Sequence, residues 1–79
     1  MSNDISNLCL VTEYQKQREY LFKSVTAMNW FVRLHKKRLV KDGALLLLLG
    51  QWRVNPERCD QVVADIGREQ AAARVAEAA

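Results

Sequence analysis

Cysteine and histidine are too scarce in this sequence for a zinc site. The chain has two cysteines, Cys9 and Cys59, and a single histidine, His35. The cysteines lie far apart and form no C-x-x-C pair, so the spacing of a structural zinc motif is missing. We therefore expect no bound metal and no other cofactor.

Sequence motifs of common catalytic chemistry are also missing. There is no Walker lysine loop, G-x-G-x-x-G, H-E-x-x-H or G-x-S-x-G, and no acid pair is placed for acid–base catalysis. His35 falls on the apolar side of an expected helix, with no serine or carboxylate beside it. We expect a packed histidine and a protein that is not an enzyme.

Long apolar runs are absent as well. The longest one, residues 44–49, is far shorter than the ~20 residues that span a bilayer. The start MSNDISNLCLV has neither a basic segment nor the cleavage signature of a signal peptide. These features predict a cytoplasmic chain that has reduced thiols and no membrane partner.

Acidic residues are nearly missing between residues 16 and 41, where Glu19 stands alone. The whole chain has a net charge of only +3, but this segment is strongly cationic. Its basic residues are Lys16, Arg18, Lys23, Arg33, Lys36, Lys37, Arg38 and Lys41. Charge concentrated in this way favours a polyanionic partner.

The chain of 79 residues is long enough for one domain. Residues 1–9 are polar and aperiodic, which predicts a flexible lead-in. Thr12, followed three residues later by Gln15, resembles a capping box and predicts a first helix that runs to about Leu21.

The second expected helix has the clearest signals. Ser24 is a good N-cap, and the helix should end at Asp42 because Gly43 can adopt the left-handed C′ conformation. Residues that recur at steps of three and four fall on a single, mainly apolar face of this helix, and Phe31 lies at the edge of that face. The residues of the face are Val25, Met28, Val32, His35 and Leu39. We expect this face to pack on the first helix.

The leucine run that follows has no period, and leucine itself prefers helices. However, Gly43 and Gly50 bracket a run of six residues, and Asn55-Pro56 closes the short W-R-V segment soon afterwards. These turn signals on both sides of two short segments favour a β-hairpin.

Asn55 as N-cap and Pro56 at the first helical position predict a third helix. Its apolar stripe ends at Gly67 and consists of Cys59, Val62, Val63 and Ile66. Residues 68–79 have high helix propensity but almost no apolar stripe, so they form either a helical extension or a disordered tail. The predicted class is α+β, mostly α: a small winged helix-turn-helix domain over residues 10–67.

The solvent side of the second helix carries side chains that suit DNA. Arginine and lysine pair with phosphates or guanine, asparagine pairs with adenine, and a threonine methyl contacts thymine. The candidates there are Thr26, Asn29, Trp30, Arg33, Lys36 and Lys37, and Gln51 and Arg53 join them at or just past the hairpin tip. The competing interpretations are an ordinary solvated face and, for Trp30, a place over the first helix or in a dimer interface.

The leucines of the hairpin point to a second kind of contact. Strand residues alternate between faces, and so small a domain cannot easily cover both faces. One set of leucines should therefore remain poorly covered, either Leu46 and Leu48 or the alternate set. We take the alternate set as the candidates for self-association: Leu45, Leu47 and Leu49. Alternatively, the third helix covers one face while Trp52, the first helix or the tail covers the other.

Several short motifs resemble the excisionase-like winged helix-turn-helix proteins of phages and integrative elements, also called recombination directionality factors. The resemblance covers roughly residues 10–67. It is carried by Ser24, Trp30, Phe31, Arg33, His35, Leu39, Gly43-Ala44-Leu45, Gly50, Trp52-Arg53-Val54, Pro56-Glu57-Arg58 and Gly67.

This resemblance implies that the second helix enters the major groove and that the hairpin touches the flanking backbone. It also implies that several copies assemble side by side on double-stranded DNA and bend it, acting with a tyrosine integrase or on nearby promoters in the nucleoid. A different hypothesis is a small phage-type inhibitor or adaptor that docks on a protein through the leucine-rich hairpin.

Overall fold

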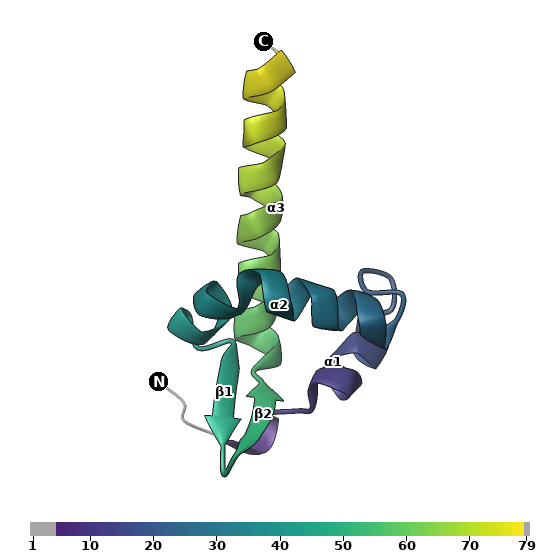
Figure 1. Ribbon diagram of the computed structural model, residues 1–79, viewed down its shortest axis with the longest axis vertical. Helices are drawn as coiled ribbons and strands as arrows, with labels where there is room; N and C mark the ends of the chain where they lie inside the picture. The colour runs from purple at the N-terminus through teal and green to yellow at the C-terminus, as the bar shows by residue number, and fades with distance from the viewer. Residues whose placement is uncertain (1–4, 79) are drawn as a thin grey trace.

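The computed structural model describes residues 5–78 and is mainly helical. In chain order its elements are η1 (Ile5–Asn7, a short 3₁₀ turn), α1 (Val11–Gln17), α2 (Val25–Lys41), β1 (Leu45–Leu48), β2 (Gln51–Val54) and α3 (Pro56–Ala78). α1 packs on α2 and β2, while α2 also packs on β1 and crosses α3 (Figure 1). Two N-terminal helices, a hairpin and a C-terminal helix form the winged helix-turn-helix layout, so the predicted fold class is confirmed.

The first helix is shorter than the sequence predicts. It ends at Gln17 rather than near Leu21. The side chain of Gln15 is buried, and its Nε2 donates a hydrogen bond of 2.7 Å to the carbonyl oxygen of Phe22. This bond stabilises the turn after α1 and holds Phe22 against the core.

The start of α1 also differs from the prediction. Thr12 and Gln15 do not form a capping box, because the helix begins one residue before Thr12. Instead, the backbone N–H of Leu10 donates to Oε1 of Glu13 at 2.8 Å. The spacing of three residues is the same, but the observed pair, Leu10 and Glu13, lies two residues before the predicted one.

The second helix begins and ends where the sequence predicts, but it is not continuous. The Oγ of Ser24 accepts the N–H of Ala27 at 3.1 Å, which caps the first turn. At His35 the backbone leaves the helical region, with φ −117° and ψ 20°. The residues after His35 therefore do not follow the helical wheel of the residues before it.

The C-terminus of α2 is a Schellman motif. Gly43 has a φ of +75°, and its N–H donates to the carbonyl of Val40 at 3.1 Å. The next N–H, that of Ala44, donates to the carbonyl of Leu39 at 2.8 Å. These two bonds satisfy free carbonyls of the last turn and direct the chain into β1.

β1 and β2 form the predicted antiparallel hairpin. Leu45 is paired with Val54, and Leu47 with Trp52. The two turn residues, Leu49 and Gly50, both have positive φ values, 50° and 78°. This is the pattern of a type I′ turn, whose twist matches that of the strands it joins.

Residues 5–9 of the expected lead-in belong to the fold. η1 is followed by a bridge in which Cys9 pairs with Val54 through two backbone hydrogen bonds of 2.9 and 2.7 Å. Residues 5–9 therefore pack along the edge of β2. Residues 1–4 lie outside the described residues.

α3 starts as predicted but continues well past the expected end. Asn55 caps it, with its Oδ1 accepting the N–H of Arg58 at 3.2 Å. Gly67 does not end the helix, and the tail is a helical extension through Ala78 that projects from the body (Figure 1). Within residues 5–78, no helix is both long and apolar enough to cross a membrane.

The core lies between the helices and the base of the hairpin. Val25, expected on the buried face of α2, is exposed because Met28 is the first residue of that helix to reach the core. The expected stripe of α3 does contribute. The buried residues are Tyr14, Phe22, Met28, Leu39, Ala44, Leu45, Val54, Cys59, Val62 and Ile66, with Val32 and Val63 packed against them.

A polar network ties α1 to α3 at the edge of this core. The hydroxyl of Tyr14 donates to Oδ1 of Asp60 at 2.6 Å, and Arg18 forms a two-pronged ion pair with the same carboxylate at 2.6 and 2.7 Å. The guanidinium of Arg18 lies over the Tyr14 ring, 4.6 Å from its centroid. These hydrogen bonds from Arg18 and Tyr14 lower the pKa of Asp60.

Two glycines give opposite predictions for stability. Gly43→Ala should destabilise the fold by about 1–2 kcal/mol, because the positive φ is strained for alanine. Its Cβ would also lie 3.2 Å from Cδ of Arg58. Gly67→Ala should instead stabilise it by up to about 1 kcal/mol, because Gly67 is helical and its Cβ would meet nothing. Urea unfolding of both variants checks this, and equal midpoints would contradict it.

Candidate nucleic-acid interface

The predicted DNA-binding residues of α2 are all exposed. Thr26, Asn29, Trp30 and Arg33 line a shallow hollow on the N-terminal half of the helix, together with Ser24 and Ala27. Trp30 is 59% exposed, so most of it faces solvent. This half of α2 therefore presents a mixed polar, aromatic and cationic surface to solvent.

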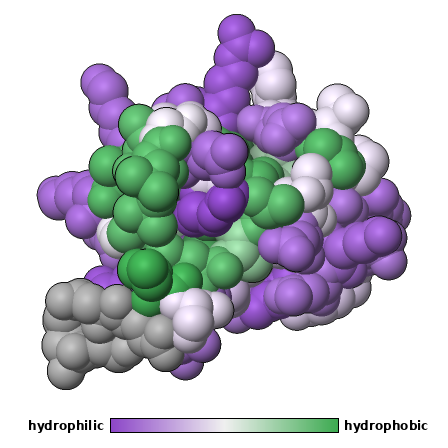
Figure 2. Space-filling view, turned by 90° about the horizontal axis from the view of Figure 1, so that it is seen from below, coloured by the Kyte–Doolittle hydropathy of each residue, from purple (hydrophilic) through white to green (hydrophobic). Residues whose placement is uncertain are grey.

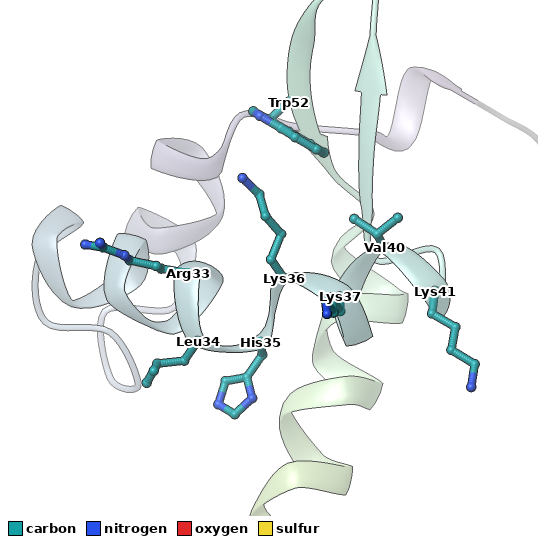
Figure 3. A pocket seen from close by; sticks show the side chains of 8 residues that line it. All are labelled: Arg33, Leu34, His35, Lys36, Lys37, Val40, Lys41 and Trp52. Atoms are coloured by element: carbon teal, nitrogen blue, oxygen red, sulfur yellow. The ribbon is translucent and has the colours of Figure 1, made fainter.

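The C-terminal half of α2 and the hairpin form a groove. It is lined by Arg33, Leu34, His35, Lys36, Lys37, Val40, Lys41 and Trp52 (Figure 3). Four of these side chains are lysine or arginine, and none is acidic. Such a surface has a positive potential that attracts phosphate groups.

Lys36 links α2 to the hairpin. Its Nζ lies over the ring of Trp52, 4.7 Å from the centroid, and Figure 3 shows the side chain pointing from α2 toward β2. A cation placed over an indole is held by the quadrupole of the ring. Lys36 and Trp52 thus join α2 and the hairpin into one surface.

Gln51 and Arg53 do not join that surface. Strand side chains alternate between faces, so both lie on the face of β2 opposite that of Trp52. Nη2 of Arg53 donates to Oε1 of Gln51 at 2.8 Å. The structure therefore places the six candidates of α2 around two hollows that share Arg33, and it separates the two candidates of the wing from the groove.

Arg38 is directed away from the groove. Its guanidinium forms two hydrogen bonds of 2.6 Å with the carboxylate of Glu69 on α3, and it also lies 3.9 Å from Asp42. The paired guanidinium lowers the pKa of Glu69. With Arg18, which pairs with Asp60, at least two of the eight cations of the basic segment are therefore already neutralised within the chain.

Five residues of the groove were not among the predicted site residues, and of these Lys41 and Trp52 matter most for binding an anion. Lys41 follows Lys37 by four residues, which places both on one side of a helix, so the spacing could have found it. No local signal marks Trp52, because its role depends on how the hairpin packs against α2.

The leucines at the tip of the hairpin form an exposed apolar surface. Viewed from the hairpin end, the molecule shows a patch of apolar side chains (Figure 2). Leu47 is 55% exposed and Leu49 is fully exposed. Leu45, expected with them, is instead part of the core at 3% exposure, because it lies at the base of the hairpin opposite Val54.

Comparison of the chain with family models, curated proteins and solved structures found no match. The winged layout and the chemistry of the surface are therefore the basis for a functional argument.

Proposed function

We propose that this protein binds double-stranded DNA in a sequence-specific manner. The observation that carries the proposal is the continuous surface of α2 and the hairpin, where Arg33, Lys36, Lys37 and Lys41 occur without an acid. An α-helix fits the major groove of B-DNA, and a wing beside it reaches the flanking backbone or minor groove.

The side chains of this surface divide into two roles. Asn29 and Arg33 suit base edges, because an amide pairs with adenine and a guanidinium with guanine. Lys36, Lys37 and Lys41 suit phosphates, which position the protein without reading sequence. Thr26 and Trp30 supply apolar contacts next to Asn29 on the same exposed side.

The biological role that we propose is that of an excisionase or a transcriptional regulator of a phage or integrative element. It is supported by the resemblance of short motifs, such as Trp52-Arg53-Val54, to those of excisionase-like proteins. In that role the chain acts in the nucleoid, assembles as several copies on DNA, and works beside a tyrosine integrase.

Salt dependence of binding tests the proposal. Phosphate contacts by Lys36, Lys37 and Lys41 give a slope of log K against log salt of about −2.7, or a loss of roughly 40-fold between about 50 and 200 mM. Fluorescence anisotropy with a labelled duplex measures this slope. Selection of bound DNA from a random library then gives the preferred sequence, and recovery of no preference would contradict specific recognition.

A second candidate is a protein-binding adaptor that docks through the hairpin. It is favoured by the exposure of Leu47 and Leu49. It predicts weak retention on heparin and no binding to DNA at ~150 mM salt, together with a protein that copurifies. Strong heparin retention and a nucleic-acid absorbance in the purified protein would favour DNA binding instead.

A further inference from the structure

Leu49 occupies a backbone position that does not suit it. Its φ of 50° lies in the left-handed region, where a branched side chain is strained. Type I′ turns favour asparagine, aspartate or glycine there. The hairpin would thus be more stable with a different residue at its first turn position.

The fold gains nothing from this leucine. The side chain of Leu49 is fully exposed, so it buries no surface against the rest of the protein. At the neighbouring Gly50, an added Cβ would meet no atom within 4 Å, which shows how narrow and open the tip is. A strained apolar side chain that makes no contact within the protein points to a contact with a binding partner.

The hairpin holds this side chain beyond the cationic groove. On one face of β1 exposure rises from the buried Leu45 to the half-exposed Leu47, and Leu49 in the turn beyond the strand is fully exposed. Trp52, which contacts Lys36 of α2, is paired with Leu47. The tip therefore begins just past the last point where the wing touches the reading helix, and it points away from the body (Figure 1).

We propose that Leu49 inserts as a wedge between stacked bases in the minor groove beside the site that α2 reads. This inference rests on the DNA-binding function proposed above. Apolar side chains that enter the minor groove partly unstack a base step. The acid-free cations of the groove hold the phosphates next to it and so favour DNA over an apolar partner.

The size of the tip argues against a protein partner at the same place. A stable protein interface buries about 800 Å² on each side. The turn itself offers one large side chain, Leu49, and even with the half-exposed Leu47 on the strand below it the apolar side chains are too few to cover such an area. A narrow wedge suits the gap between two bases better than it suits a protein surface.

A pair of duplexes tests the wedge. The two duplexes have the same sequence of about 40 base pairs, except that one of them contains a tandem T·T mismatch. Unstacking the bases costs less free energy at the mismatch than at a paired step. We expect the wild-type protein to bind the mismatched duplex at least ~10-fold more tightly, because unstacking a paired step costs a few kcal/mol. In Leu49→Asn this preference should fall to about 1, while affinity for the paired duplex changes less than ~3-fold.

Two further variants act as controls. Leu47→Asn changes an exposed leucine on the strand rather than at the tip, and it should keep the mismatch preference. Leu49→Met keeps an apolar side chain at the tip, so it should also keep the preference for the mismatched duplex. The thermal midpoint of Leu49→Asn should not fall, because asparagine tolerates a positive φ.

The outcomes separate the two proposals. Wild-type protein that binds both duplexes equally overturns the wedge but leaves DNA binding intact. The wedge is also overturned if Leu49→Asn keeps the preference, loses affinity for both duplexes to the same extent, or lowers the mass of the free protein in sedimentation. Wild-type protein that binds neither duplex overturns DNA binding itself, and the wedge with it.

Discussion

Arg33→Ala should weaken binding to the selected DNA site by about 1–3 kcal/mol, which is about 5- to 150-fold in affinity. Arg33 borders both the N-terminal hollow and the groove, so it lies at the centre of the exposed surface of α2. A guanidinium at that place can form two hydrogen bonds with a guanine edge. Its loss should also flatten the base preference at one position of the site.

Lys37→Ala is the matched control for this variant. Lys37 lies in the same groove but is assigned to a phosphate, so its loss should weaken binding to all DNA sequences similarly. The slope of log K against log salt should become shallower by about 0.9. Competition anisotropy with cognate and scrambled duplexes measures both effects. Unchanged binding by Arg33→Ala would show that α2 is not the reading helix.

The boundaries that the sequence predicted correctly depend on local chemistry. Ser24 and Asn55 cap helices because their side chains accept nearby N–H groups. Gly43 ends α2 because it can adopt a positive φ. Each signal lies within a few residues of the boundary it sets, so a single sequence is enough to find it.

The helix boundaries that were predicted wrongly depend on contacts or context beyond the boundary residues themselves. α1 ends early because Gln15 bonds to Phe22 and Arg18 reaches Asp60 on α3, partners that no local pattern reveals. A glycine is tolerated inside a helix when the residues around it are strong helix formers, so Gly67 alone does not end α3.

The same distinction holds for the site. Helical periodicity correctly placed Asn29, Trp30 and Arg33 on the exposed side of α2. The break at His35 and the contact between Lys36 and Trp52 depend on packing and were not foreseen. Strand alternation alone could not show that Leu45 is buried while Leu47 is exposed, because the difference reflects how far the hairpin protrudes.

Asp60→Ala should lower the free energy of unfolding by about 2–3 kcal/mol. The variant removes the acceptor of the fully buried Tyr14 and the ionic partner of Arg18, and so it loosens α1 from α3. Because the Asp60 side chain is 45% exposed, water screens the ion pair, and the loss stays below that of a buried pair. For a domain whose total stability is roughly 4–12 kcal/mol, this is a large fraction.

Asp65→Ala is the control on the same helix. Asp65 pairs with Arg68 and accepts a hydrogen bond from Gln61, both of which lie one turn away on α3 itself, so its removal should cost less than about 0.5 kcal/mol. Urea unfolding at neutral pH compares the two variants. Similar losses for both would show that the contact between Asp60, Tyr14 and Arg18 adds nothing beyond an ordinary surface ion pair.

The stability that Asp60 provides should also depend on pH in one direction. Arg18 lowers the pKa of Asp60 in the folded state, so the folded protein binds the carboxyl proton more weakly than the unfolded chain does. The contribution is therefore fully present above about pH 4 and is lost as the pH falls through the lower folded pKa. Asp60→Asn cannot titrate, so the difference in unfolding free energy between wild type and Asp60→Asn should shrink from about pH 5 toward pH 2. A difference that stays constant over this range would mean that the carboxylate charge is not what joins α1 to α3.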